Sequence, residues 1–121
     1  MAILNLFKYV KDSVEFPEGH IIYKEGEVNT GIAYVILEGE VEVTVEGKYL
    51  ETTTAGGLLG ELSLLDNLPH SSTCTAKTLV KAAPIDQQRF LFMVQETPFF
   101  AIEVMRVMAN RLRRQRISTP A

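Results

Sequence analysis

The sequence predicts a mainly β domain that ends in α-helices, with an antiparallel jelly-roll barrel over about residues 14–85 and two helices over about 86–116. Turn signals recur at short intervals up to residue 85, and one segment between them alternates apolar and polar residues. After Ile85, helix-capping residues replace the turn signals. Because 121 residues with 46% hydrophobic content suffice for a single core, we expect residues 1–121 to form one domain.

The barrel strands are expected between closely spaced turns. Residues 1–13 precede them, predicted as a short helix or extended lead-in that carries Leu4, Leu6 and Phe7 toward the core. The clearest strand is EVEVTVE, 40–46, in which the valines face one way and the polar residues the other. Gly-containing turns lie at 17–19, 25–27, 29–31, 38–39, 46–47 and 56–57, and further strands are expected at 20–24, 32–37, 72–76 and 79–85.

Two helices are predicted after the barrel. Asp86 is a good N-cap for a helix to about Glu96, and Thr97 caps a second helix that has Pro98 at its first position. The apolar arc of the second helix spans roughly 220°, wider than the ~100° stripe of a surface helix. Either the barrel and first helix cover this arc, or part of it packs against another subunit. Its residues are Phe100, Ile102, Val104, Met105, Val107, Met108, Ala109 and Leu112.

Charge and composition exclude several classes of function. A net charge of −3 and a pI near 5.4 argue against broad nucleic-acid binding. Five arginines in the last helix, at 106, 111, 113, 114 and 116, are more typical of a solvated face than of a basic patch. The N-terminal stretch MAILNLFKYVKD is too short and too charged for a signal peptide or a membrane span. We therefore expect a cytoplasmic protein that makes no membrane contact.

The single cysteine and the two histidines do not indicate a cofactor. Cys74 has no partner for an internal disulfide and is expected to be a small buried hydrophobe. His20 and His70 lack the spacing of a metal-ligand cluster, and an iron–sulfur cluster needs several cysteines. A metal, haem or enzymatic role is therefore disfavoured, and no cofactor is expected to be required.

The stretch GELSLLDNLPHSSTCTA, residues 60–76, is the candidate binding segment. Gly56, Gly57 and Gly60 allow close backbone approach, and a helical turn that begins near Glu61 would present N–H groups to an anion. The Glu61 carboxylate would repel a phosphate unless it accepts hydrogen bonds from hydroxyls such as those of a sugar. A sugar phosphate would use both features. Alternatively, Glu61 caps its own helical turn, and the spacing does not distinguish the two roles.

Five segments together resemble the cyclic nucleotide-binding domain of catabolite-activator-type regulators, cyclic-nucleotide-gated channels and protein kinase A regulatory subunits. The resemblance implies a jelly-roll (double-stranded β-helix) barrel with a short cassette helix and C-terminal B and C helices. The matching segments are FPEGHIIYKEGE, AYVILEGEVEV, GGLLGELSLL, PHSSTCTA and IDQQRFLFMVQETPFFAIEVMRVMANRL.

The resemblance also implies a ligand site. Glu61 matches the residue that binds the ribose 2′-hydroxyl, the N–H groups around Gly60–Leu62 match contacts to the cyclic phosphate or ribose, and Ser71 matches a phosphate contact. The purine-contacting positions fall around Arg114 and Gln115. The candidate ligand-binding residues are Leu59, Gly60, Glu61, Leu62, Ser63, His70, Ser71 and Ser72.

His70 departs from the family pattern, because it stands where the family has an arginine that pairs with the phosphate. A guanidinium is always charged and offers a two-pronged fork, whereas imidazole, with an ordinary pKa of about 6.5, is mostly neutral at pH 7. Binding is therefore expected to be weaker, and to strengthen in acid because the anion favours protonated His70. The alternative is that His70 is an exposed loop residue without a ligand role.

These observations lead to two functional hypotheses. The first is a non-enzymatic regulatory domain that binds cAMP, cGMP or a related anionic small molecule and signals through its C-terminal helices. The second is a degenerate, ligand-free module that acts in protein–protein interaction. In both, we expect a homodimer through helix 98–116 and no DNA binding by this chain alone, because it ends at Ala121, where DNA-binding relatives continue into a helix-turn-helix.

Overall fold

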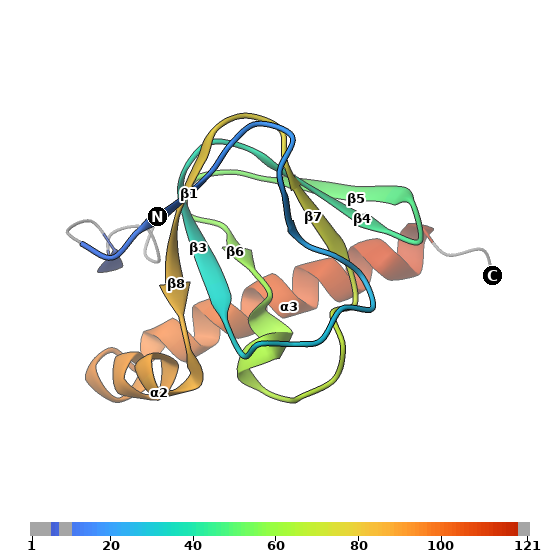
Figure 1. Ribbon diagram of the computed structural model, residues 1–121. Coiled ribbons are helices and arrows are strands. Elements are labelled where there is room, and N and C mark those ends of the chain that lie inside the picture. The colour runs from blue at the N-terminus through green and yellow to red at the C-terminus, as the bar shows by residue number, and fades with distance from the viewer. Residues whose placement is uncertain (1–5, 8–10, 119–121) are drawn as a thin grey trace.

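A computed structural model describes residues 6–7 and 11–118, with the side chains of the last helix described as far as Arg114. Two four-stranded antiparallel sheets, in the orders β1-β8-β3-β6 and β2-β7-β4-β5, form the barrel (Figure 1). The predicted fold class is confirmed. The strands are β1 Val14–Phe16, β2 Ile21–Tyr23, β3 Ala33–Glu38, β4 Val41–Val45, β5 Lys48–Thr53, β6 Leu58–Leu59, β7 Thr73–Ala76 and β8 Val80–Ile85.

The β4-β5 hairpin shows how the local sequence sets the register. Val41 and Val43 are buried on the inner face of β4, whereas Glu42 between them is partly exposed, as the alternation predicts. A two-residue loop, Glu46-Gly47, joins β4 to β5, and both residues have positive φ, 52° and 78°. Such a turn matches the twist of a hairpin. Two short strands, β1 with three residues and β6 with two, were not predicted.

The β1-β8-β3-β6 sheet is buried on both faces. Within β3, Val35 faces the helices while Ile36 faces the other sheet, and both are wholly buried. In β6, Leu58 likewise faces the helices and Leu59 faces the other sheet. Neighbouring side chains of a strand point to opposite faces of the sheet. When both faces are buried, the strand sequence is therefore a continuous apolar run rather than an alternation. Two apolar layers, one between the sheets and one under the helices, therefore form the core.

Helices α2, Gln87–Glu96, and α3, Phe99–Ser118, cover the outer face of this sheet (Figure 1). Asp86 is the N-cap of α2, as predicted, and its side chain accepts a hydrogen bond from the Arg89 N–H. Thr97 terminates α2, and its N–H donates to the Met93 carbonyl oxygen. The assigned start of α3 is Phe99, one residue beyond the predicted position. Among the described residues, none of the helices is long and apolar enough to cross a membrane.

The N-terminal lead-in is only partly described. Phe7 is 3% exposed and packs in the helix-side core, as predicted, and its ring lies 6.4 Å from that of Phe100. Leu6 was expected to point toward the core but is 40% exposed, so that expectation is wrong. Leu4 and most of residues 1–13 before β1 lie outside the described residues.

The apolar arc of α3 is covered only in part. Phe100 and Val104 are buried against the barrel, with Val107 and Met108 packed beside them. Ile102, Met105 and Leu112 are 42%, 53% and 60% exposed. The barrel and α2 therefore do not cover the whole arc within one chain, which leaves the second of the two alternatives, a partner on the outer face of α3, as a prediction.

Candidate functional site

The candidate binding segment begins with a turn that only glycine suits. Gly60 has φ 69°, in the left-handed region, and Glu61–Leu64 follow as a single 3-10 turn, η1. A Cβ on Gly57 would lie 2.3 Å from the Thr53 side chain, so the backbone approaches closely there too. The Ser63 N–H donates to the Gly60 carbonyl oxygen, and Leu64 is buried in the helix-side core. The predicted helical turn is therefore present, and the buried side chain of Leu64 attaches it to the core.

A cavity of about 370 Å³ lies between this segment, the β2-β7-β4-β5 sheet and α3. Its base includes Val43, Leu50 and Cys74 from the barrel, and Met108 and Leu112 line it from α3. Seven of the eight predicted ligand-binding residues line it: Gly60, Glu61, Leu62, Ser63, His70, Ser71 and Ser72. The eighth, Leu59, is wholly buried between the two sheets and faces away from the cavity. The dimensions suit a small molecule of mixed polarity.

Glu61 is buried and forms an ion pair with an arginine of α3. Its side chain is 7% exposed, and its Oε2 accepts a hydrogen bond from Arg111 Nη1 at 2.5 Å. The N-terminus of η1 is Gly60, with no side-chain cap, so the structure does not support a capping role for Glu61. A buried carboxylate facing a cavity is stabilised by this ion pair.

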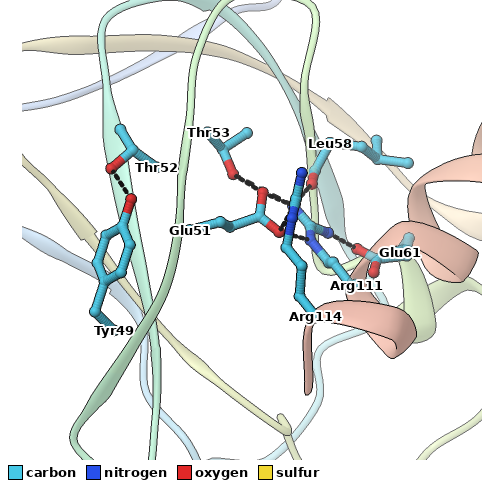
Figure 2. Close-up of polar contacts among 8 residues, drawn as sticks. All are labelled: Tyr49, Glu51, Thr52, Thr53, Leu58, Glu61, Arg111 and Arg114. Carbon is cyan, nitrogen blue, oxygen red and sulfur yellow. Dashed lines mark hydrogen bonds and ion pairs between the residues drawn. The ribbon is translucent and has the colours of Figure 1, made fainter. Parts of the chain in front are cut away.

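Arg111 connects three barrel elements (Figure 2). Besides Glu61 of η1, its guanidinium donates to Glu51 of β5 through Nε at 2.9 Å and to the carbonyl oxygen of Leu58 in β6. Its side chain is only 14% exposed, so the interpretation of the α3 arginines as a solvated face is wrong for Arg111. The helical period contains a signal that was missed: Arg111 follows Phe100, Val104 and Val107 at helical spacing, on the face that packs against the barrel.

Glu51 was also missed by the sequence analysis. Burial alone would raise the pKa of its carboxyl, but hydrogen bonding and charge from Arg111 outweigh burial, and the pKa is lowered. Burial opposes the charge of Arg111, yet Glu61 and Glu51 hold its pKa above the ordinary value. These pKa directions mean that the carboxylate of Glu51 and the guanidinium of Arg111 remain charged at neutral pH.

His70 lies at another part of the cavity wall. Its ring stacks on Tyr23 with centroids 4.1 Å apart and an interplanar angle of 17°. Backbone hydrogen bonds fix it on both sides: its N–H donates to Glu27 and its carbonyl oxygen accepts from Gly26. His70 is half-buried, so the alternative of an exposed loop residue is wrong in its exposure. Burial lowers the pKa of the imidazole and so favours the neutral ring, whereas the nearby charge of Glu27 has the opposite, smaller effect.

The remaining predicted positions are placed as follows. Cys74 is wholly buried, and burial raises the pKa of its thiol to about 11, as expected for a small core residue. Arg114 is half-exposed and forms an ion pair with Glu51 at 2.9 Å, whereas the side chain of Gln115 lies outside the described residues. No group of three or more His, Cys, Asp or Glu side chains in the described part of the chain could hold a metal ion.

Comparisons with known proteins match most of the chain. The family model for the cyclic nucleotide-binding domain matches residues 13–97. The chain is 33% identical over 118 residues to a CRP-like cAMP-activated global transcriptional regulator of Mycobacterium tuberculosis, an alignment that covers 93% of this chain and 52% of the regulator. It is 40% identical over 84 residues to a Drosophila melanogaster cGMP-dependent protein kinase, covering 69% of this chain and 8% of the kinase.

A solved structure has the same fold. Thermus thermophilus catabolite activator protein superposes with a TM-score of 0.75 at 22% identity, covering 93% of this chain and 60% of that protein. The chain thus spans about half, or much less, of the length of the curated relatives named above. The family model covers well over half of the sequence, and the cavity lies where the predicted ligand residues converge. The chain belongs to the cyclic nucleotide-binding domain family.

Proposed function

We propose that this chain is a regulatory sensor domain that binds a cyclic nucleotide, cAMP or cGMP, or a related anionic small molecule, in the cavity between the barrel and α3. The observation that carries the proposal is that one cavity is lined by Glu61, by His70 and Ser71, and by side chains of α3. The cavity therefore brings together an acceptor for sugar hydroxyls, donors for a phosphate and one face of α3. The cAMP-activated regulator and the cGMP-dependent kinase support this class of ligand.

The signal to α3 passes through Glu61 and Arg111. A ribose hydroxyl that donates to Glu61 has to share the carboxylate with Arg111 Nη1, which occupies Oε2 in this structure. Ligand binding therefore changes the hydrogen bonds of a side chain that belongs to α3. Since Met108 and Leu112 of the same helix line the cavity, a bound ligand also contacts α3 directly. The C-terminal part of α3 is thus the element that reports the ligand.

The side chain of His70 is expected to bind a phosphate only weakly. His70 offers one donor and a neutral ring at pH 7, where an arginine would offer a fixed charge and a fork. A bound cyclic phosphate stabilises the protonated ring, so binding takes up a proton and the affinity rises as the pH falls. We therefore expect a sensor with lower affinity than a relative with arginine at this position.

The exposed apolar residues of α3 support a homodimer. Ile102, Met105, Ala109 and Leu112 follow one another at intervals of three, four and three residues, which is the seam of a two-stranded coiled coil. Packing this seam against the same helix of a second copy would cover Ile102, Met105 and Leu112. The same helix would then connect the ligand cavities of two subunits.

Isothermal titration calorimetry of the purified chain with cAMP and with cGMP, at pH 6 and pH 8, tests the proposed function. We expect a saturable heat for at least one nucleotide, larger affinity at pH 6, and loss of binding in Glu61→Ala. The variant Glu103→Ala, which removes a carboxylate from α3 outside the cavity lining, is the matched control. Absence of heat for both nucleotides at both pH values contradicts the proposal.

A second function, a ligand-free module for protein contact, has one specific observation in its favour. The two side chains with the clearest ligand roles are both engaged within the chain: Glu61 with Arg111, and His70 with Tyr23. If these contacts have replaced the ligand, His70→Arg will bind neither nucleotide. If His70→Arg binds either one tightly, the cavity is competent and this second function is excluded.

A further inference from the structure

The wall that α3 adds to the cavity is attached to the barrel by few groups. Beyond Met108, the described polar contacts from α3 to the barrel come from Arg111 and Arg114. Both side chains donate to one acceptor, Glu51 Oε1, each at 2.9 Å (Figure 2). We call Glu51, Arg111 and Arg114 the Glu51 clamp. A single carboxylate on β5 therefore connects successive turns of α3 to the barrel.

Glu51 has no direct access to the ligand. It is not among the residues that line the cavity, whereas Arg111 and Glu61 are. Its side chain is 13% exposed, and its Oε2 accepts a further hydrogen bond from the Thr53 hydroxyl. The charged groups that connect Glu51 to the cavity are the arginines that it holds.

The strand register explains how Glu51 reaches α3. Glu51 pairs with Val43, whose side chain lies on the inner face, and the register then shifts so that Thr44 pairs with Tyr49. The residue skipped is Leu50, which itself lines the cavity. The regular pairs Val41–Thr53 and Val43–Glu51 put Glu51 on the same inner face as Thr53, where its carboxylate meets Arg111 of α3. An apolar side chain would be expected at this position.

The planar guanidinium of Arg111 binds a different carboxylate at each of two edges. Nε, with Nη2 at 3.4 Å, faces Glu51, and Nη1 faces Glu61. Because the fork is rigid, the position of one edge fixes the position of the other. When a ligand hydroxyl competes for Glu61, Arg111 keeps its charged partner on β5.

We propose that Glu51 is a positioning residue of the nucleotide site, which holds the C-terminal half of α3 against the barrel and presents Arg111 Nη1 to Glu61. For its effect on ligand affinity, this inference rests on the proposed function. The holding of α3 is a property of the chain without ligand, so the two are tested separately. Neutralising Glu51 loosens α3 at the cavity and lowers affinity without removing a ligand contact.

The test compares Glu51→Gln with the unchanged chain in two measurements. Gln keeps the size of the side chain and removes its charge, so packing is retained. Hydrogen exchange without ligand is expected to become about 10-fold faster at the amides of 108–114, and the affinity for cAMP or cGMP to fall about 10-fold, the loss typical of one charged hydrogen bond. The control Glu103→Gln, which neutralises the partner of Arg106 on the same helix, should change neither measurement.

A second variant keeps the test decisive if Glu51→Gln folds poorly. Arg114→Gln removes the half-exposed member of the clamp and should also speed exchange at 108–114, by a smaller factor. Only exchange is compared for this variant, because Arg114 stands near the expected purine-contacting positions. Combining Glu51→Gln with Arg111→Lys should cost less than the sum of the single changes, because both act through one contact. A role of Glu51 in barrel stability alone would give additive losses instead.

The outcomes of the two measurements are independent. If exchange at 108–114 is unchanged in Glu51→Gln and Arg114→Gln, or if it rises in Glu51→Gln while nucleotide affinity stays at the original value, the proposal is overturned. If the unchanged chain binds neither nucleotide, the proposed function fails, and the exchange measurement alone decides whether Glu51 holds α3.

Discussion

The two halves of α3 are held against the barrel by different forces. In the N-terminal half, Phe100 and Val104 are each 1% exposed and sit in an apolar core with β3, β6 and β8. In the C-terminal half, beyond Met108, the attachment is an ionic network centred on Arg111 at the edge of a cavity. Apolar burial is non-directional and a small polar ligand cannot compete with it, whereas a hydrogen-bonded carboxylate can exchange partners. Under the proposed function, one helix would combine a fixed end with an end that responds to the ligand.

The largest expected effect concerns the fixed end. Phe100→Ala should lower the free energy of unfolding by about 4 kcal/mol, because it empties a site between the barrel and the Phe7 and Phe90 rings. Denaturant titration measures this loss. The neighbouring Phe99→Ala is the control, since Phe99 is 55% exposed and its removal should cost well under 1 kcal/mol. Equal losses for the two variants would show that the apolar core does not fix this end.

The next effect concerns the C-terminal half of α3. Arg111→Ala leaves Glu61 buried without its cation and Glu51 with Arg114 alone, and should cost about 3 kcal/mol of unfolding free energy at pH 7. Arg113→Ala, on the exposed side of the same turn, serves as control. A loss below about 0.5 kcal/mol in Arg111→Ala would mean that the network contributes little to the docking of α3.

Acid should weaken the same network. The pKa of Glu51 is lowered in the folded chain, so its contribution to stability is present above the ordinary carboxyl pKa of about 4.3 and is lost as the pH falls through the lower folded value. Thermal unfolding at pH 5 and at pH 3 should show a smaller acid-induced loss for Glu51→Gln than for the unchanged chain. The same loss in both would contradict the assignment of Glu51.

A smaller effect is expected at His70, the proposed phosphate contact of the cavity. Without ligand the pKa of His70 lies below its ordinary value, and a bound anion raises it, so affinity should increase as the pH falls from 8 to 6. At pH 8 the affinity of His70→Arg for the nucleotide should be at least about 10-fold higher than that of the unchanged chain, and it should no longer depend on pH in this range. His70→Gln, neutral at every pH, is the control. A pH dependence that persists in both variants would assign the titration to another group.

The smallest expected effect on folding is at the exposed seam of α3. Met105→Glu places a charge on the outer face, where Met105 is 53% exposed, and should change the stability of the single chain by less than about 0.5 kcal/mol. If the seam forms the proposed homodimer, light scattering of the unchanged chain gives twice the mass of one chain, and the variant gives one. Monomer mass for the unchanged chain up to high concentration would contradict the dimer.

Most of the fold could be predicted because its signals are local. The alternation at Val41 and Val43 and the cap at Asp86 depend only on neighbouring residues, and the structure confirms both, whereas Val45, beyond a register shift, is only partly buried. Leu59 was assigned to the site because it adjoins Gly60, although its side chain points between the sheets. The adjacency of residues in a strand does not indicate which face each occupies when both faces are apolar.

The ionic part of the site could be predicted only in part. Arg111 belongs to the buried face of α3 by its spacing, but its charge suggested solvent, and the carboxylates that make burial possible come from distant parts of the chain. Glu51 lies opposite Val43 on the inner face of the β4-β5 hairpin, where the period of two predicts an apolar residue rather than a carboxylate. The pairing of β5 with β4 and the path of α3 have to be known before its role can be recognised.

The most direct test of the difference between the two halves of α3 is hydrogen exchange of the chain with and without saturating cAMP, read separately at amides 100–107 and 108–114. We predict that the nucleotide changes exchange in 108–114, where Arg111 and Met108 meet the cavity, and leaves 100–107 unchanged. An equal change in both halves, or no change in 108–114 at a nucleotide concentration that saturates binding, would contradict the account.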